Sequence, residues 1–163
     1  MVGFEPPTEF LLTQAIRSLS VLDVHNILKQ EPRRVTEETD PTSGRTPLHW
    51  ATLQASNEIV SLLLQTDALV NVAEKVGGWT PLHLAVLTLN PDLCELLLSN
   101  GADPAILDKD NKSCYDLVVE VNDESFLDIF RKYDEDPQSF LKQSCRRKRT
   151  QGMLLGLIPP HRQ

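Results

Sequence analysis

The sequence has few cysteines, no long apolar run and no excess of positive charge. Its 163 residues include three cysteines, which form no CxxC pair and no metal-ligand spacing. Because an odd number of cysteines does not make a disulfide framework, we expect reduced thiols in a cytoplasmic or nuclear protein. No apolar run reaches the roughly 18–20 residues of a membrane span. The first ten residues also lack the basic and apolar regions of a secretory signal, so no membrane partner is expected.

The charge limits the class of partner. The net charge is -7 and the isoelectric point is near 5.0, which argues against direct binding of nucleic acid by the domain. The charge is uneven, since residues 134–163 carry +3 and residues 1–133 carry -10. The sequence shows no phosphate-binding loop, zinc motif or nucleophile elbow. It therefore predicts neither an enzyme nor a bound cofactor or metal.

One stretch of the sequence recurs. GRTPLHWA at residues 44–51 returns as GWTPLHLA at residues 78–85, an offset of 34 residues. Each copy is followed, at the same distance, by a second apolar stretch, at 59–64 and at 93–98. A period of about 33 residues with TPLHxA is typical of a unit made of a β-turn and two helices, which buries its apolar side only by stacking on neighbours. In each copy we expect the threonine to cap the first helix and the proline to occupy its first position.

Similar apolar spacing without TPLH flanks the two copies. Residues 10–28 indicate a first helix pair capped by Thr8, and residues 111–130 indicate a terminal pair. Glu31–Ser43 has two prolines and many charges, so it is predicted to be an exposed loop. Gly101 is predicted to end a helix in the left-handed region. The predicted domains are a lead-in at 1–9, a repeat domain at 10–133 with units at 10–43, 44–77, 78–110 and 111–133, and a flexible basic tail at 134–163.

The TPLH units resemble ankyrin repeats over about three quarters of the chain. This resemblance implies an all-α solenoid of about four helix pairs joined by β-turn fingers. It also implies a non-enzymatic module, monomeric when free, that binds another protein through a concave groove. Residues 80–104 are most similar to a repeat of the inhibitor-of-NF-kappa-B (I-kappa-B) proteins. The similarity is carried by the LAV-x-T pattern of Leu84, Ala85, Val86 and Thr88, and by Pro91 at the start of the second helix.

The I-kappa-B resemblance implies a partner. Members of that family bind Rel-type transcription factors through the ankyrin stack, so a regulator of such a factor is the specific expectation. A generic ankyrin adaptor or an assembly chaperone for an unrelated protein is the alternative.

The histidines and tryptophans of the repeated stretch have different expected roles. His49 and His83 lie just inside the first helices without a nucleophile or carboxylate beside them, so we expect them to hydrogen-bond backbone between repeats. Trp50 aligns with the inward Leu84 and is predicted to be a core residue. Trp79 occupies a variable finger position that core packing does not require to be tryptophan. We favour an interface anchor there over an aromatic that packs on its own loop.

The predicted protein-binding surface consists of variable positions on the first helices and on the fingers. Two leucines at consecutive groove positions form its apolar part, unless they tuck under the fingers. The acidic residues Glu37, Glu38, Asp40 and Glu120 either frame a site for a basic partner segment or form a solvated surface. The predicted binding residues are Arg45, Leu53, Gln54, Val76, Trp79, Leu87, Thr88 and Lys112.

The tail carries two further motifs. The basic run of Arg146, Arg147, Lys148 and Arg149 resembles a nuclear-import signal, with a solubilising charge run as the alternative. Met153–Pro160 is apolar and is either a docking peptide or an unstructured end.

Overall fold

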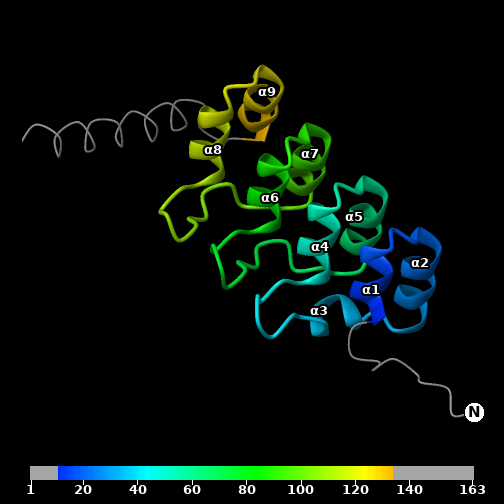
Figure 1. The fold of residues 1–163 in the computed structure, drawn as a ribbon. Coiled ribbons are helices and arrows are strands. Elements are labelled where there is room, and N and C mark those ends of the chain that lie inside the picture. Colours follow the sequence, from blue (N-terminus) through cyan, green and yellow to red (C-terminus); the bar gives the residue numbers. More distant parts are fainter. Residues whose placement is uncertain (1–10, 134–163) are drawn as a thin grey trace, which may run out of the picture.

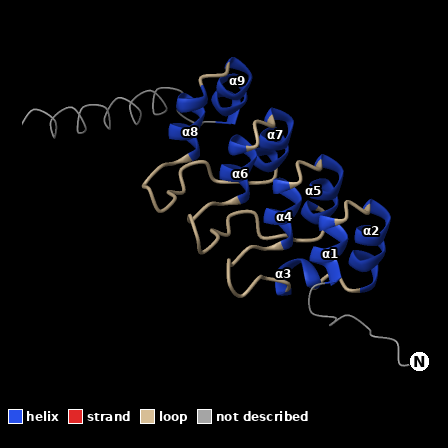
Figure 2. Ribbon diagram, in the orientation of Figure 1, coloured by secondary structure: helices blue, strands red, loops and turns tan. Residues whose placement is uncertain are grey.

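The chain forms two rows of helices (Figure 1). The computed structural model describes residues 11–133, and all regular structure in that range is helical (Figure 2). The inner row consists of α1 (Leu11–Arg17), α4 (Pro47–Leu53), α6 (Pro81–Leu87) and α8 (Cys114–Val121), and the outer row of α2 (Val21–Gln30), α5 (Asn57–Leu64), α7 (Pro91–Ser99) and α9 (Glu124–Tyr133). Each inner helix packs on the outer helix that follows it and on the next inner helix. The predicted all-α solenoid of helix pairs is confirmed.

The inner helices begin where the repeated stretch predicts. Pro47 and Pro81 are the first residues of α4 and α6, a position where the missing N–H of proline removes no helical hydrogen bond. The last inner helix, α8, has no TPLH and begins differently. The N–H of Ser113 donates to the carboxylate of Asp116 at 2.9 Å, and the N–H of Asp116 donates back to the Ser113 hydroxyl at 3.3 Å. Thr46 with His49 and Thr80 with His83 form the same kind of reciprocal cap at α4 and α6, so α8 keeps the cap with other residues and lacks only the proline.

A continuous apolar core runs between the two rows. Leu48 and Leu82 of the inner row are buried, as are Ile59 and Leu93 of the outer row. These leucine and isoleucine positions recur once in each repeat, so every helix pair contributes to the same core. In the last pair the core is completed by aromatic rings. Phe130 of α9 packs edge-on against Tyr115 of α8, with ring centroids 5.8 Å apart.

The loops before α4, α6 and α8, at residues 39–46, 72–80 and 106–113, form the expected fingers. Each finger is closed by a backbone hydrogen bond from the N–H of its acidic residue to the carbonyl just before the helix cap. These bonds join Asp40 to Arg45, Glu74 to Trp79 and Asp108 to Lys112, each at 2.9 Å. The same three acidic side chains also accept hydrogen bonds from amides inside the turn. The fingers are therefore rigid turns and not open loops.

Successive fingers are tied to one another. The N–H of Lys75 donates to the carbonyl of Ser43 at 2.6 Å, and the N–H of Lys109 donates to that of Gly77 at 2.8 Å. Gly44 has a φ of 70°, and a Cβ added there would lie 2.7 Å from the Lys75 side chain. The glycine therefore allows both the left-handed turn and the close approach of the next finger.

The prediction of an exposed loop at Glu31–Ser43 is wrong in part. A single helical turn, α3 (Arg34–Glu37), forms there, and Glu38 after it is buried. The Glu38 carboxylate accepts the backbone N–H groups of Leu12 at 3.0 Å and Thr13 at 2.9 Å. These amides open α1 and have no partner within the helix, so a carboxylate from a distant loop stabilises the helix start.

The turns between inner and outer helices share one strained position. Leu19, Ala55, Leu89 and Asn122 have φ between 52° and 55° and stand at equivalent places in the four helix pairs. Asparagine tolerates this left-handed region, whereas leucine does not favour it. Asp67, after α5, also has a positive φ of 59°, as does Gly101 after α7 with 84°, and the expected helix end at Gly101 is confirmed.

Several predicted features lie outside the described residues. These are the lead-in at 1–9 with its Thr8 cap, the tail at 134–163, the basic run Arg146–Arg149, and Met153–Pro160.

Candidate protein-binding surface

His49 and His83 orient the fingers, as expected. The Nδ1 atom of His49 accepts the N–H of Thr46 at 3.1 Å, and its Nε2 donates to the carbonyl of Trp79 at 3.0 Å. His83 repeats this pattern, with Nε2 3.3 Å from the carbonyl of Lys112. Burial lowers the pKa of both imidazoles, which keeps them neutral with Nδ1 as an acceptor. Each histidine thus fixes the finger of the next repeat.

Arg45, a predicted binding residue, lies against an aromatic ring of its own repeat. Its guanidinium carbon is 5.2 Å from the centre of the Trp50 ring. The nearest carboxylate is that of the buried Glu74, with Nε and Oε2 3.9 Å apart. Burial raises the pKa of Glu74, but hydrogen bonds from the amides of Gly77 and Val76 outweigh that effect and hold the pKa below its usual value. The Glu74 carboxylate is therefore already occupied inside its finger.

Trp50 packs against the core but is not fully buried, so the prediction made from its alignment with Leu84 holds only in part. Leu84 is 2 % exposed, whereas Trp50 is only half-buried at the edge of the core. Two guanidinium groups lie over its ring, that of Arg45 and, 5.4 Å from the ring centre, that of Arg17. The two guanidinium groups thus lie against the part of the indole at the edge of the core.

Trp79 is half-buried and packs on its own finger. A Cβ added at Gly77 would lie 2.7 Å from the Trp79 ring, so the indole covers the backbone of that glycine. The neighbouring Val76 is 65 % exposed and has no apolar cover. The aromatic is therefore held in place by its loop while part of its surface stays accessible. Trp79 thus packs on its own loop, and its role as an interface anchor stays a prediction.

The predicted positions on the inner helices differ in exposure. Leu87 at the end of α6 is 46 % exposed, whereas Leu53, its equivalent on α4, is half-buried. Gln54 is exposed, and Thr88 donates its hydroxyl to the carbonyl of Ala85 at 3.2 Å. Because α4 and α6 are neighbours in the inner row, Leu53 and Leu87 belong to one surface.

Three of the acidic residues suggested as a frame for a basic partner are engaged within the chain. Glu38 caps α1, and Asp40 accepts hydrogen bonds from Ser43 and Thr42 that hold its pKa well below the usual value. Glu120 is exposed and pairs with Lys112, Nζ to Oε1 at 2.9 Å. Two of these four carboxylates are thus parts of the internal structure, and a third is neutralised locally. Glu38, Asp40 and Glu120 therefore do not offer free carboxylates to a basic partner.

Two exposed features of the surface were not found from the sequence. No sequence pattern marks Arg17 as part of the surface, because it lies in the first helix pair, which lacks TPLH. Leu89 was not considered because it follows the helix, yet it is 62 % exposed beside Leu87. The positive φ at Leu89 could not be predicted from its residue type, because glycine or asparagine fits such a position best and the sequence has leucine there.

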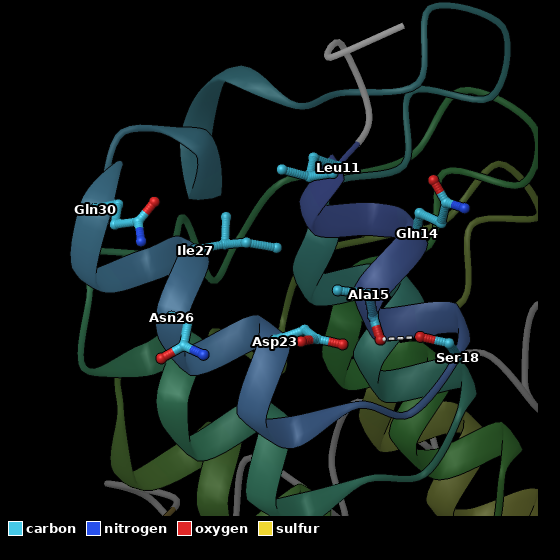
Figure 3. Close-up of a pocket in the computed structure, with 8 residues that line it drawn as sticks. All are labelled: Leu11, Gln14, Ala15, Ser18, Asp23, Asn26, Ile27 and Gln30. Atoms are coloured by element: carbon cyan, nitrogen blue, oxygen red, sulfur yellow. Dashed lines mark hydrogen bonds between the residues drawn. The ribbon is translucent and has the colours of Figure 1, made fainter. Parts of the chain in front are cut away.

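A hollow lies on the outward end of the first helix pair, away from α4 (Figure 3). It forms because α1 and α2 have no helix pair packed on that side among the described residues. None of the predicted binding residues lines it. Its lining residues are Leu11, Gln14, Ala15, Ser18, Asp23, Asn26, Ile27 and Gln30.

The described part of the chain was predicted to hold no metal site or membrane span, and its cysteines to be reduced thiols. Cys94 and Cys114 are buried as free thiols, and burial raises the pKa of Cys94 to about 12. Within residues 11–133 no group of three histidines, cysteines or carboxylates is placed to hold a metal ion. In the same range no helix has the length and apolar character needed to cross a membrane.

A protein-family model matches this chain. The model for ankyrin repeats (3 copies) matches residues 12–108, which is more than half of the chain. The matched range contains the first three helix pairs and reaches the last finger, and α8 and α9 lie beyond it. A search of curated proteins finds no match.

Proposed function

The chain belongs to the ankyrin-repeat family, a class of protein-protein interaction modules, and we propose that it regulates a partner protein by binding one of its segments. The binding surface we propose is the inner-helix face, which we define as the exposed side of α4 and α6 together with the fingers before α4, α6 and α8. The partner is a protein and not a nucleic acid, because the net charge is -7.

The observation that supports this surface best is its exposed apolar side chains. Val76 is 65 % exposed, Leu87 is 46 % exposed, and Trp79 is held half-buried by Gly77. None of these three side chains is needed to fill the core between the helix rows. Exposed apolar groups on a rigid scaffold are typical of protein interfaces, where tryptophan often contributes much of the binding energy.

The partner we propose is a Rel-type transcription factor, with the chain acting as an I-kappa-B-like regulator in the cytoplasm and nucleus. Two features support this proposal. Residues 80–104 resemble an I-kappa-B repeat, and the run Arg146–Arg149 resembles a nuclear-import signal. A generic adaptor or an assembly chaperone with another client is the alternative, and it uses the same surface.

The test is a binding measurement between the whole chain and a purified Rel-type dimer by calorimetry. The double substitution Trp79→Ala and Leu87→Ala should weaken binding by about 2 kcal/mol, roughly 30-fold in Kd. The matched control is Leu22→Ala, because Leu22 is a 69 % exposed leucine on the outer helix α2. This control should leave the affinity unchanged.

The possible results test the identity of the partner and the location of the binding surface separately. If the wild-type chain does not bind the Rel-type dimer, the transcription-factor proposal is wrong. A different client captured from a cell lysate, and lost with the double substitution, would then favour the adaptor. A client bound equally by wild type and the double variant would contradict the proposed surface. Circular dichroism must show that each variant keeps its helices.

A further inference from the structure

At one end of the inner-helix face, Arg45 of the finger before α4 and Arg17 of the neighbouring helix α1 lie against a single indole. The guanidinium carbons of Arg17 and Arg45 lie 5.4 Å and 5.2 Å from the centre of the Trp50 ring. We infer that this cluster of Arg17, Trp50 and Arg45 receives an aspartate or glutamate side chain of the partner segment. The inference rests on the proposed function and specifies the chemistry of the partner at one position.

The donors of Arg17 are free within the described part of the chain. Arg17 is exposed at the end of α1, and no carboxylate or carbonyl of residues 11–133 accepts a hydrogen bond from it. Other arginines differ in this respect. Arg34 lies 3.1 Å from a Glu38 oxygen, and Arg131 is 3.1 Å from oxygens of both Glu124 and Asp128. Arg33 also has no carboxylate within ion-pair distance among the described residues, but only Arg17 and Arg45 lie over the Trp50 ring.

Arg45 is incompletely paired as well. Its Nε is buried and has no hydrogen-bond partner among the described residues. The only nearby carboxylate, Glu74, is 3.9 Å away and already accepts the N–H of Val76 at 3.0 Å and that of Gly77. The buried Nε of Arg45 faces Glu74 inside the fold, but its side chain is 23 % exposed, and no residue of 11–133 accepts a hydrogen bond from its terminal N–H groups. These terminal groups, like those of Arg17, are the donors available to an anion from outside the fold.

The indole makes the pair suitable for a carboxylate. A guanidinium held over an aromatic face loses less freedom on binding, and its planar set of donors matches the two oxygens of a carboxylate. Residues 11–133 contain ten Lys and Arg against eighteen Asp and Glu. This net negative charge repels large anions. A nucleic acid would be repelled by that field, whereas one acidic side chain needs only the local cluster.

The apolar part of the surface begins next to the cluster. Leu53 is on the same helix as Trp50, one turn later, and Leu87 is on the neighbouring helix α6. Packed helices lie about 8–10 Å apart, and an extended chain advances about 3.3 Å per residue. A partner segment lying across α4 and α6 would therefore place its acidic residue about three positions from an apolar residue.

The experiment is a selection of random twelve-residue peptides displayed on phage against the immobilised whole chain. We expect the selected peptides to share an aspartate or glutamate about three positions from an apolar residue. The same selection on Arg17→Gln and on Arg45→Gln should lose the acidic preference and keep the apolar one. The matched control is Lys29→Gln on the outer helix, which removes one exposed positive charge elsewhere and should not change the preference.

A selected peptide then gives a quantitative test. Replacing its acidic residue by the neutral amide should weaken binding to the wild-type chain by about tenfold or more. The same peptide change should have little effect on binding to the Arg17→Gln variant. That variant has already lost the contact between the arginine and the peptide carboxylate. Because Arg17 is exposed, we expect Arg17→Gln to leave the fold intact. Its effect on peptide binding can therefore be interpreted even if Arg45→Gln disturbs the finger.

The outcomes distinguish this inference from the proposed function. Peptides with apolar but no acidic preference, or an acidic preference that both arginine substitutions leave intact, would overturn the inference alone. Peptides rich in lysine or arginine would overturn it in favour of a basic partner. If the wild-type chain selects no peptide at all, binding of a partner segment, and with it the proposed function, is contradicted.

Discussion

The imidazole Nε2 of His49 donates to the backbone oxygen of Trp79, 3.0 Å away and thirty positions later in the sequence. The same oxygen accepts the N–H of Glu74 at 2.9 Å. One histidine in the helix of one repeat thus holds the closing point of the next finger. The finger carries Val76 and Trp79, two of the proposed binding residues, so we expect both the stability of the fold and the shape of the proposed surface to depend on this bond.

The free energy of unfolding should fall as the pH drops below about 6.5. Burial lowers the pKa of His49 and His83 in the folded chain, so the unfolded chain binds more protons once the pH falls below its ordinary histidine pKa of about 6.5. The stabilisation is therefore complete above that pH and is lost below it. Carboxylates with lowered pKa values act in the same direction only below about pH 4. Urea unfolding at pH 7.5 and pH 5.5 isolates the histidines.

The control for this pH dependence is the exposed His25. His83→Gln should remove part of the difference between the two pH values, and His25→Gln should remove none of it. An unchanged difference in His83→Gln would show that the buried imidazoles are not its cause.

Glu38→Gln should destabilise the fold by about 1–3 kcal/mol. The carboxylate accepts N–H groups of both Leu12 and Thr13, whereas an amide offers one oxygen and turns a donor towards the other N–H. The comparison is Glu31→Gln, because Glu31 pairs with Arg34 at the surface, with 59 % of its side chain exposed. That change should cost less than about 1 kcal/mol. Equal effects of the two substitutions in chemical denaturation would argue against the cap.

Two leucines of α6 should respond differently to truncation. Leu82 is 1 % exposed and Leu87 is 46 % exposed. Leu82→Ala should destabilise by about 2–5 kcal/mol because it leaves a cavity in the core. Leu87→Ala should change the free energy of unfolding by less than about 1 kcal/mol. A large loss at Leu87 would make it a core residue and remove it from the binding surface.

The strained turn position gives a pair of opposite predictions. Leu89→Asn should stabilise the chain by about 0.5–1 kcal/mol, because asparagine tolerates a φ of 55° better than leucine. Asn122→Leu places leucine at the equivalent turn, where φ is 53°, and should destabilise by a similar amount. Thermal unfolding of the two variants compares them directly. The same sign of change in both would rule out backbone strain as the cause.

The sequence predicted those parts of the fold that repeat or that depend on neighbouring residues. Pro47 and Pro81 opened the inner helices as expected, and His49 formed the predicted link between repeats, because the same local pattern occurs twice. The family match over residues 12–108 agrees with this reading. The unit boundaries and the binding residues stay predictions.

The errors arose where a residue depends on a distant segment. The buried position of Glu38 depends on amides 25 and 26 residues earlier, which no local pattern indicates. The contact of Trp50 with Arg17 joins two helix pairs, and the pair that holds Arg17 carries no TPLH to fix its register. The prolines and charges of Glu31–Ser43 likewise give no sign that Glu38 is buried.

The chain contains two tryptophans, and both are half-buried on the face proposed to bind the partner. The fold thus carries its own fluorescent reporters, and the core contributes no tryptophan background. Trp50 emits beside two cations and Trp79 emits from a finger, so a segment that excludes water from either indole would shift its emission to shorter wavelength. Phenylalanine at one position or the other would show which end of the face a ligand covers, without any attached dye.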